Sequence, residues 1–543
     1  MIRFPGPVEQ TVIPLLGAEE IEEATVGDVL RRSATMSPDA LALVEGLPPG
    51  QPRRRWTYAE LLADSERAAR AMLEHLDPGD KVAIWANNLP EWILVQMGAA
   101  LAGLTLVTVN PALRRDEAAH VLRNSAAGAV FHVDEYLGSD LTTCLDEIAD
   151  QTPNLRTKIR LDRWDEFCAR GHSSTPLPEV RPDDVAQIQY TSGTTGTPKG
   201  AVLRHRSLVN NSRLSFAQRL SSVHAAPLVN AMPLFHTAGS VLLTLGSVQT
   251  QSTQVLMPTF KPDLQLALIE SERSVLFGGV PTMLRAMLEH KDFERTDLSS
   301  VTVALSGGAV VEHTLVEEVE ARVGVPFVIL YGQTECSPTI TMTHPDDAPE
   351  MRATTVGRAL PGVEVKLVDP ADPNRAVVTG EVGEVCTRGF HVMAGYHDNP
   401  GQTADAIDSD GWLHTGDLAS MDRNGNLRVV GRIKDMIIRG GENIYPSEVE
   451  AATLEHEAVA EAAVVGIPDD YWGEEVAAFV KLRAGMLADR GQLEGFLATK
   501  LARHKVPRHW HFVDEFPLTA SGKILKTKLK DLARDGDCGV VSQ

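Results

Sequence analysis

The sequence is poor in cysteine, and its few cysteines are scattered. The 543-residue chain has five: Cys144, Cys168, Cys336, Cys386 and Cys538. No two of them form a C-x-x-C pair, so the common zinc-binding spacings are excluded. An odd number of widely separated cysteines also gives no sign of a disulfide framework. We therefore expect a reduced, cytoplasmic compartment.

Positive charge is scarce as well. The formal net charge is −22 at pH 7. A nucleic-acid-binding protein needs a basic face to meet the phosphates, so this class of function is excluded. An anionic small-molecule ligand is still compatible, because it requires only local positive charge and backbone N–H groups.

Long hydrophobic runs are missing too. The most apolar stretch, residues 92–109, is interrupted by Gln96, Gly98 and Gly103, and we expect no transmembrane segment. Residues 1–10 lack the pattern of a secretory signal. Peripheral membrane contact and a homodimer stay open at this stage.

What the sequence does contain is material for a large globular protein. Hydrophobic residues make up 43% and charged residues 23%, and the length predicts two or more domains. Residues 81–87 read as a strand, Pro90 opens a helix that ends near Gly103, and residues 104–109 read as the next strand. This βαβ pattern predicts parallel pairing with a right-handed crossover.

The same alternation recurs along the first part of the chain. Further strands are predicted at 129–133, 229–232, 254–257, 275–277 and 301–305. Between residues 363 and 430 the strands become shorter and Asp-Gly or Asn-Gly turns appear, which favours antiparallel, barrel-like structure. The prediction is an α/β fold with parallel-sheet subdomains and a small antiparallel part.

The last part of the chain has the size of a small separate domain. A helix after Pro446, strands at 462–466 and 477–481, and a helix at 489–502 are expected. We place the boundary near Lys434, which gives a large domain at 1–433 and a small α+β domain at 434–543.

The segment Tyr190–Gly200, YTSGTTGTPKG, is the most distinctive feature of the sequence. Its glycines allow a tight backbone, whose N–H groups and hydroxyls can surround phosphate oxygens, and Lys199 adds a positive charge. The spacing is not that of a Walker A loop. The competing interpretation is an ordinary surface loop.

This segment resembles the phosphate loop of the adenylate-forming enzymes. That superfamily includes acyl-CoA synthetases, adenylation domains of nonribosomal peptide synthetases and beetle luciferase. Further segments resemble the family's motifs in the family's order: AMPLFHTAG, LSGGAV, YGQTE, HTGD, RGGEN and PLTASGKILK. The resemblance implies a large N-terminal domain, a small mobile C-terminal domain, and ATP, Mg²⁺ and coenzyme A as cofactor and co-substrates.

The resemblance also implies which residues bind the nucleotide. The phosphate-loop residues would be Thr191, Ser192, Gly193, Thr194, Thr195, Gly196 and Lys199. The adenine would lie against Gly307, Gly308, Ala309, Tyr331 and Gly332, and the ribose against Asp417 and Arg432.

Four residues receive catalytic roles in the same way. Thr334 would donate to the α-phosphate, and Glu335 is a hard oxygen ligand suited to Mg²⁺. His236 would lie beside the substrate carboxylate, and Lys523 would reach both that carboxylate and the α-phosphate. A histidine that caps a helix and a solvated glutamate are the plainer interpretations of His236 and Glu335.

In the second half of the chain the resemblance makes Lys434 the hinge. Gly440, Gly441 and Glu442 would contact the pantetheine arm of coenzyme A. The plainer alternatives are an ordinary hairpin turn for the glycines and a surface ion pair of Lys434 or Arg432 with Asp435.

The predicted function is an ATP-dependent acyl-CoA synthetase, an AMP-forming acid–thiol ligase that makes acyl-AMP and then acyl-CoA. Gly239, Gly278 and Gly279 are small and suggest room for a medium- or long-chain fatty acid, and a cyclic or aromatic acid is an alternative. Loading of a carrier protein, a luciferase-like monooxygenase and a non-catalytic nucleotide-binding protein also stay open. The segment before His236 has no Asp, which argues against an amino-acid substrate.

Overall fold

The computed structural model describes residues 11–172, 175–191, 198–518 and 524–535. These residues form two compact units. Unit 1 comprises Ile13–Val365 and Thr387–His414, and unit 2 comprises 11–12, Lys366–Cys386 and 415–535. The hinge near Lys434 stays a prediction, because compactness alone does not locate a hinge. Within the described part of the chain, no helix has the length and apolar character needed to span a bilayer.

The first sheet of unit 1 confirms the predicted βαβ unit. Its strand order is β11-β10-β5-β4-β6-β9. The strands are β4 (Lys81–Trp85), β5 (Thr105–Val109), β6 (Ala129–His132), β9 (Thr157–Arg160), β10 (Val185–Thr191) and β11 (Lys199–Arg204). All neighbours are parallel except β10 and β11. Helix α3 (Pro90–Leu101) begins with its proline at the first turn and is buried along its whole length.

Two further sheets of unit 1 each contain three parallel strands. One has the order β12-β13-β2-β3 and the other β14-β15-β16-β17-β18. Their strands are β2 (Leu41–Glu45), β3 (Arg55–Thr57), β12 (Pro227–Asn230), β13 (Thr253–Leu256), β14 (Leu276–Gly278), β15 (Val303–Gly307), β16 (Phe327–Gly332), β17 (Thr339–Met342) and β18 (Arg358–Ala359). Strand β3 is an antiparallel edge strand of the first of these two sheets, and β17 and β18 extend the second with antiparallel pairing. The predicted parallel α/β subdomains are therefore confirmed.

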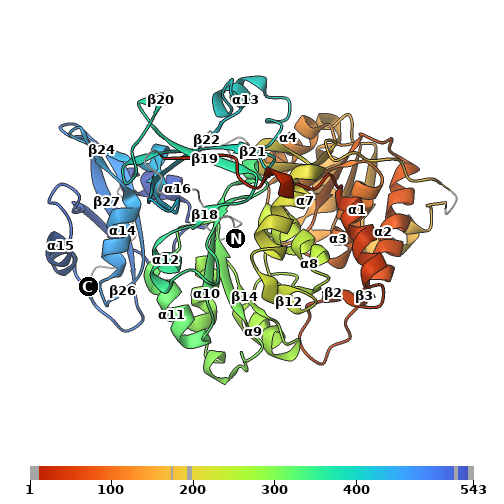
Figure 1. The fold of residues 1–543 in the computed structure, drawn as a ribbon, viewed down its shortest axis with the longest axis horizontal. Helices are drawn as coiled ribbons and strands as arrows, with labels where there is room; N and C mark the ends of the chain where they lie inside the picture. Colours follow the sequence, from red (N-terminus) through yellow and green to blue (C-terminus); the bar gives the residue numbers. More distant parts are fainter. Residues whose placement is uncertain (1–10, 173–174, 192–197, 519–523, 536–543) are drawn as a thin grey trace. The chain divides into compact units, whose positions relative to one another are not determined.

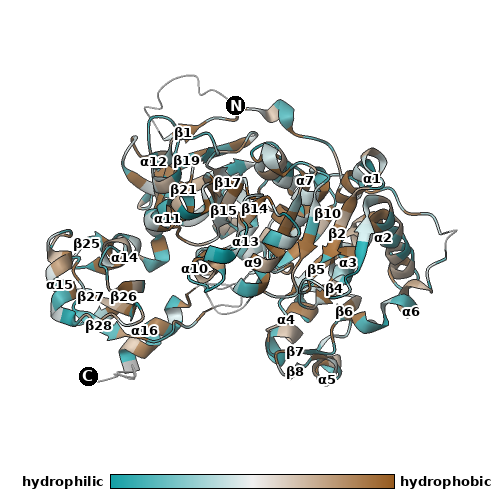
Figure 2. Cartoon of the chain, turned by 90° about the horizontal axis from the view of Figure 1, so that it is seen from below, coloured by the Kyte–Doolittle hydropathy of each residue, from teal (hydrophilic) through white to brown (hydrophobic). Residues whose placement is uncertain are grey.

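Helices surround these sheets in unit 1 (Figure 1). Helices α1 (Val26–Met36) and α2 (Tyr58–Leu73) each begin with a threonine capping box, at Thr25 and Thr57. The others are α4 (Arg115–Ser125), α5 (Leu141–Glu147), α6 (Trp164–Cys168), α7 (His205–Ser212), α8 (Gly246–Gln249), α9 (Pro262–Ser271), α10 (Pro281–Leu288), α11 (His313–Val323), α12 (Pro349–Thr354) and α13 (Pro400–Ala406). Figure 2 shows strands such as β4 and β5 in hydrophobic colours, in agreement with their burial.

Residues 363–430, for which the sequence predicts antiparallel structure, form most of a six-stranded sheet. Its order is β1-β19-β21-β22-β23, with β20 beside β19. The bounds are β1 (Val12–Ile13), β19 (Val363–Asp369), β20 (Asp372–Ala376), β21 (Val382–Gly389), β22 (Leu413–Met421) and β23 (Leu427–Arg432). Strand β22 pairs antiparallel with β23, as the Asn-Gly turn between them predicts.

The end of unit 2 is the predicted small α+β fold. Its sheet has the order β25-β24-β27-β26, with β28 parallel to β27. The elements are β24 (Ile437–Arg439), β25 (Glu442–Ile444), α14 (Pro446–Leu454), β26 (Val459–Asp469), β27 (Gly473–Leu482), α15 (Arg490–Ala498), β28 (His509–Phe512) and α16 (Lys526–Asp535). Buried residues of β26, β27 and α16 form an apolar core that includes Val465, Phe479 and Leu529.

Candidate active site

The predicted adenine-binding residues of unit 1 collect at one end of a sheet. Strands β14, β15 and β16 are parallel, with Gly307 opposite Leu330. Their carboxyl ends therefore lie at the same edge, where α/β proteins bind ligands. Gly307 ends β15, and Gly308 and Ala309 follow it. Tyr331 and Gly332 end β16, and Thr334 and Glu335 follow it.

The glycines at this edge are required by the packing of the strands. A Cβ atom on Gly307 would lie 2.5 Å from the carbonyl oxygen of Leu330, and one on Gly332 would lie 2.0 Å from that of Pro338. Gly308 has a φ of +75°. Close approach of backbone to backbone thus explains these glycines without a ligand, and it also leaves a flat surface against which an adenine ring can lie.

Glu335 is held on both its main chain and its side chain. It lies in the short helix η8 (Thr334–Cys336), and its carbonyl oxygen accepts a hydrogen bond from the N–H of Met393 at 2.8 Å. Its carboxylate oxygen Oε1 accepts a hydrogen bond from the Tyr396 hydroxyl at 2.7 Å. Thr334 beside it is buried. A half-buried carboxylate whose orientation is fixed in this way fits a hard cation such as Mg²⁺.

A buried asparagine fixes the turn that follows Glu335. The side-chain amide of Asn211 donates to the carbonyl oxygens of Cys336 (3.2 Å) and Thr339 (2.8 Å). Its Oδ1 accepts from the N–H of Thr339 at 3.0 Å. The three hydrogen bonds satisfy main-chain groups that would otherwise be buried without partners.

The predicted phosphate loop connects two antiparallel strands. Thr191 ends β10 and Lys199 begins β11, and the two residues face each other across the ladder. Ser192, Gly193, Thr194, Thr195 and Gly196 lie outside the described residues. The ammonium group of Lys199 lies 5.3 Å from the centre of the Tyr396 ring, a distance at which a cation and an aromatic face attract.

Tyr396, which the sequence analysis missed, connects Lys199 with Glu335. Its segment lies along β11, where Val202 donates to the carbonyl of Gly395 (3.0 Å) and accepts from Ala394 (2.9 Å). The N–H of His397 donates to the carbonyl of Gly200 at 2.7 Å. No motif pointed to Tyr396, because it is 61 residues from Glu335 along the chain.

The residue before His236 is hydrogen-bonded to β10, the strand that leads into the predicted phosphate loop. The side chain of Gln189 in β10 donates to the carbonyl of Phe235. The Nδ1 atom of His236 accepts from the N–H of Ala238 at 3.2 Å, at the start of helix η6 (Ala238–Leu245). The ring thus caps a helix, as its plainer interpretation has it, and the role beside a carboxylate stays a prediction.

The expectation that Gly239 leaves room for substrate is wrong. A Cβ atom there would lie 2.3 Å from the carbonyl oxygen of Pro233. The position is filled by the turn itself, which Asn88 holds by donating to the carbonyl of Met232 (2.9 Å) and accepting from the N–H of Leu234 (2.8 Å).

In unit 2 the predicted ribose-binding residues form a cross-strand pair. Asp417 on β22 is opposite Arg432 on β23, and Nε of Arg432 donates to Oδ1 of Asp417 at 3.0 Å. The Asp417 side chain is 7% exposed, whereas that of Arg432 is 50% exposed. Lys434 is half-buried, and burial lowers its pKa, with the nearby charge of Arg432 acting in the same direction.

The RGGEN segment is a two-residue β-hairpin between β24 and β25. Gly440 and Gly441 have φ values of +60° and +88°, as the tight turn requires. A Cβ atom on Gly440 would lie 2.6 Å from the Trp472 ring, over which the Arg439 guanidinium lies at 4.6 Å. Glu442 is exposed at the end of the turn. The plainer hairpin interpretation is therefore right, while contact with pantetheine stays a prediction.

Lys523 lies outside the described residues. Its neighbour Lys526 begins α16 and donates to Oε1 of Glu450 at 2.6 Å. The ion pair between Lys526 and Glu450 is half-buried.

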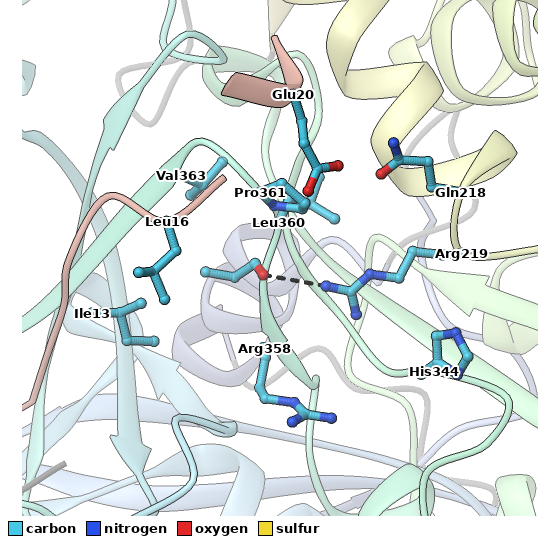
Figure 3. A pocket seen from close by; sticks show the side chains of 11 residues that line it. Ile13, Leu16, Glu20, Gln218, Arg219, His344, Arg358, Leu360, Pro361 and Val363 are labelled. Atoms are coloured by element: carbon cyan, nitrogen blue, oxygen red, sulfur yellow. Dashed lines mark hydrogen bonds between the residues drawn. The ribbon is translucent and has the colours of Figure 1, made fainter. Parts of the chain in front are cut away.

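A cavity of about 330 Å³ lies elsewhere in unit 1 and contains none of the predicted site residues (Figure 3). Its polar wall includes Arg219, which donates to the carbonyl oxygens of Met342 (2.8 Å) and Ala359 (3.2 Å). Burial lowers the pKa of this guanidinium to about 10. Apolar residues such as Ile13 and Leu360 form another part of the wall. Because the cavity and the strand-end site share no residue, we treat them as separate.

Comparison with known proteins places this geometry in a family. The model of the AMP-binding enzyme family matches residues 30–397, and that of the AMP-binding enzyme C-terminal domain matches residues 448–523. The chain therefore belongs to the AMP-binding enzymes, the adenylate-forming superfamily, in its acyl-CoA synthetase branch. The predicted class, an AMP-forming acid–CoA ligase, is confirmed with it.

Individual relatives cover nearly the whole chain. The Bacillus subtilis (strain 168) protein YngI is 38% identical over 94% of this chain and 97% of its own. The rat (Rattus norvegicus) mitochondrial medium-chain acyl-CoA ligase ACSF2 is 35% identical over 93% of this chain and 87% of its own. The crystal structure of the anthranilate CoA ligase AuaEII with anthranoyl-AMP has a TM-score of 0.86 and 25% identity, covering 95% of this chain and 98% of that one.

Proposed function

We propose that the protein joins a carboxylic acid to coenzyme A in two steps at the expense of ATP. The first step forms an acyl-AMP and releases pyrophosphate, and the second transfers the acyl group to the thiol. The observation that carries this proposal is the connection of Lys199 and Glu335 through Tyr396, since a cation of the predicted phosphate loop and the predicted metal ligand contact the same side chain.

The chemistry explains why these residue types are needed. A carboxylate becomes a good acyl donor only when its oxygen carries a better leaving group, which AMP provides after attack of the carboxylate on the α-phosphorus. Both reactants are anionic, so the barrier is mainly electrostatic and orientational. Mg²⁺, when bound, would neutralise phosphate charge as pyrophosphate leaves.

The chain's own residues would share the remaining tasks. Glu335 would hold the metal ion, and Lys199 would bind the phosphates. Thr334 would donate to the α-phosphate, and Tyr331 would stack on the adenine. Asp417 would accept hydrogen bonds from the ribose, and Lys523 would bind the carboxylate and the α-phosphate together.

A medium- or long-chain fatty acid is the substrate that we propose. The name of the rat relative, a medium-chain acyl-CoA ligase, supports it. A cyclic or aromatic acid is the second candidate, because the anthranilate CoA ligase has the same fold over nearly its whole length. Loading of a carrier protein would use the same acids, but the acceptor would be the thiol of a carrier protein instead of coenzyme A.

We also propose a reducing, cytoplasmic compartment. Cys144 and Cys168 carry free thiols, and free thiols are typical of such compartments. A homodimer and peripheral contact with membranes stay predictions from the sequence.

Pyrophosphate release with Mg-ATP across a panel of carboxylic acids, each with and without coenzyme A, tests the function. We expect release that depends on a fatty acid and yields the matching acyl-CoA. Preference for aromatic acids would select the second candidate, and adenylate that never reaches coenzyme A would indicate carrier loading. Absence of release with every acid would contradict the proposal.

A further inference from the structure

Three segments that are far apart in the sequence meet at the Tyr396 side chain in unit 1. Its hydroxyl donates to Oε1 of Glu335 at 2.7 Å. Its ring lies 5.3 Å from the ammonium of Lys199. The hydroxyl is therefore directed at the predicted metal ligand, and the ring face at the predicted phosphate-binding cation.

We propose that Tyr396 is a positioning residue that couples the phosphate-loop lysine to the metal-binding carboxylate. This inference rests on the proposed function, because it assigns Glu335 to Mg²⁺ and Lys199 to the phosphates. It adds that neither group is oriented alone: one side chain sets the position of both.

The hydroxyl selects one orientation of the carboxylate. A glutamate side chain rotates freely about its last bond unless one of its oxygens is held. By donating to Oε1, the Tyr396 hydroxyl fixes the plane of the carboxylate and leaves Oε2 available for an ion. Loss of such an outer-sphere partner typically weakens metal affinity by about 10- to 100-fold.

The position of the tyrosine is itself fixed by the surrounding chain. Its N–H donates to the Thr403 hydroxyl at 2.9 Å, and Thr403 lies in α13. The side chain of Asn399 caps this helix by accepting from the N–H of Gln402 at 3.1 Å. Hydrogen bonds with β11 hold the residues on both sides of Tyr396. The ring therefore forms a fixed platform beside Lys199.

Two substitutions separate the contributions of the hydroxyl and the ring. Tyr396→Phe removes the hydrogen bond to Glu335 and keeps the ring face, whereas Tyr396→Leu removes both contacts. The measurement is equilibrium binding of ATP over a series of Mg²⁺ concentrations, including none, by calorimetry without an acid substrate. This readout does not depend on turnover.

For Tyr396→Phe we expect the Mg²⁺ concentration that gives half of the maximal gain in ATP affinity to rise about 10-fold. The affinity for ATP without metal should be unchanged. For Tyr396→Leu we expect in addition a loss of about 2- to 5-fold in metal-free ATP affinity, the size of a cation–π contact. This second loss should vanish in a Lys199→Met background, since the cation is then already absent.

Tyr58→Phe is the matched control. It removes a tyrosine hydroxyl from α2 of the same unit, one that donates to the carbonyl oxygen of Ser252 at 2.7 Å. We expect no change in Mg²⁺ dependence for this variant. Thermal unfolding of each variant confirms that it is folded.

The outcomes distinguish the inference from the function on which it rests. Failure of the wild-type protein to bind ATP in a Mg²⁺-dependent manner would overturn the proposed function. Normal binding by the wild type together with an unchanged Mg²⁺ dependence in Tyr396→Phe would overturn the inference alone. Equal weakening of metal-free and Mg²⁺-bound ATP in that variant would also overturn it, since it would indicate a general structural role.

Discussion

The two units hold their predicted site residues in different ways. In unit 1, Lys199 and Glu335 are tied through Tyr396 to main-chain hydrogen bonds and buried strands. In unit 2, Asp417 pairs with Arg432, whose side chain is half exposed, and the two glycines form the tip of a hairpin. The comparison shows that the predicted site residues of unit 1 are fixed by contacts between distant segments, whereas those described in unit 2 are held within local antiparallel strand pairs.

The largest effect should come from Lys523→Ala, in the C-terminal part of the chain. We expect adenylation to fall by about 10²–10³-fold, because one preorganised charge contact is lost. Transfer from preformed acyl-AMP to coenzyme A should fall much less, and ATP binding should be unchanged. Pyrophosphate exchange and thioester formation from synthetic acyl-AMP measure the two half-reactions.

Lys526→Ala is its control. This substitution removes the half-buried ion pair with Glu450 and leaves Lys523 in place. Adenylation should stay near that of the wild type. Equal losses in both half-reactions of Lys523→Ala would contradict the role assigned to that lysine.

Glu335→Gln tests the predicted metal ligand of unit 1, because glutamine has nearly the same shape as glutamate but no charge. The amide oxygen can still accept from Tyr396, but the negative charge that would hold a metal ion is gone. We expect adenylation to fall by about 10²-fold or more, and ATP binding to lose its dependence on Mg²⁺. Glu350→Gln, an exposed position of the same unit, should leave both quantities unchanged.

Lys434→Pro addresses the predicted hinge. Proline fixes φ and so restricts rotation of the chain at this position. We expect thioester formation to fall by about 10²-fold, the size of a misplaced reactant, while pyrophosphate exchange changes little. Lys434→Ala keeps the backbone free and should show neither loss. If both activities fell equally in Lys434→Pro, the hinge would have to be elsewhere.

The smallest effect concerns the stability of unit 1. In Gly332→Ala the added methyl group would meet the carbonyl oxygen of Pro338 at 2.0 Å, and such overpacking costs about 1–3 kcal/mol. Gly401→Ala, where nothing lies within 4 Å of the added atom, should be neutral or stabilising. Chemical unfolding of both variants measures the difference, and an equal stability would contradict the proposed clash.

The sequence was sufficient to predict the parallel sheets and the order of the motifs. The strand near 81–87 and the helix from Pro90 are signalled by local apolar runs and by a proline, and both are found as β4 and α3. The Asn-Gly turn before β23 was equally local. Helix α15 ends at Ala498, earlier than the predicted residue 502, because helix ends depend on weak signals.

What could not be predicted depends on contacts between distant segments. Tyr396, Asn88 and Asn211 act on chain segments far away in the sequence, and no spacing reveals such partners. Gly239 looked like a residue that opens a pocket, yet the carbonyl of Pro233 occupies that space. A small residue type shows that something lies close, but it does not tell whether that is a ligand or the protein itself.

The side chain of Asn211 has a consequence for the chemical lifetime of the protein. An asparagine deamidates when the following main-chain N–H attacks its side-chain amide. Asn211 is fully buried inside α7, and its amide is bonded to Cys336 and Thr339. The turn after Glu335 is therefore held by an amide that the fold itself protects from this form of ageing.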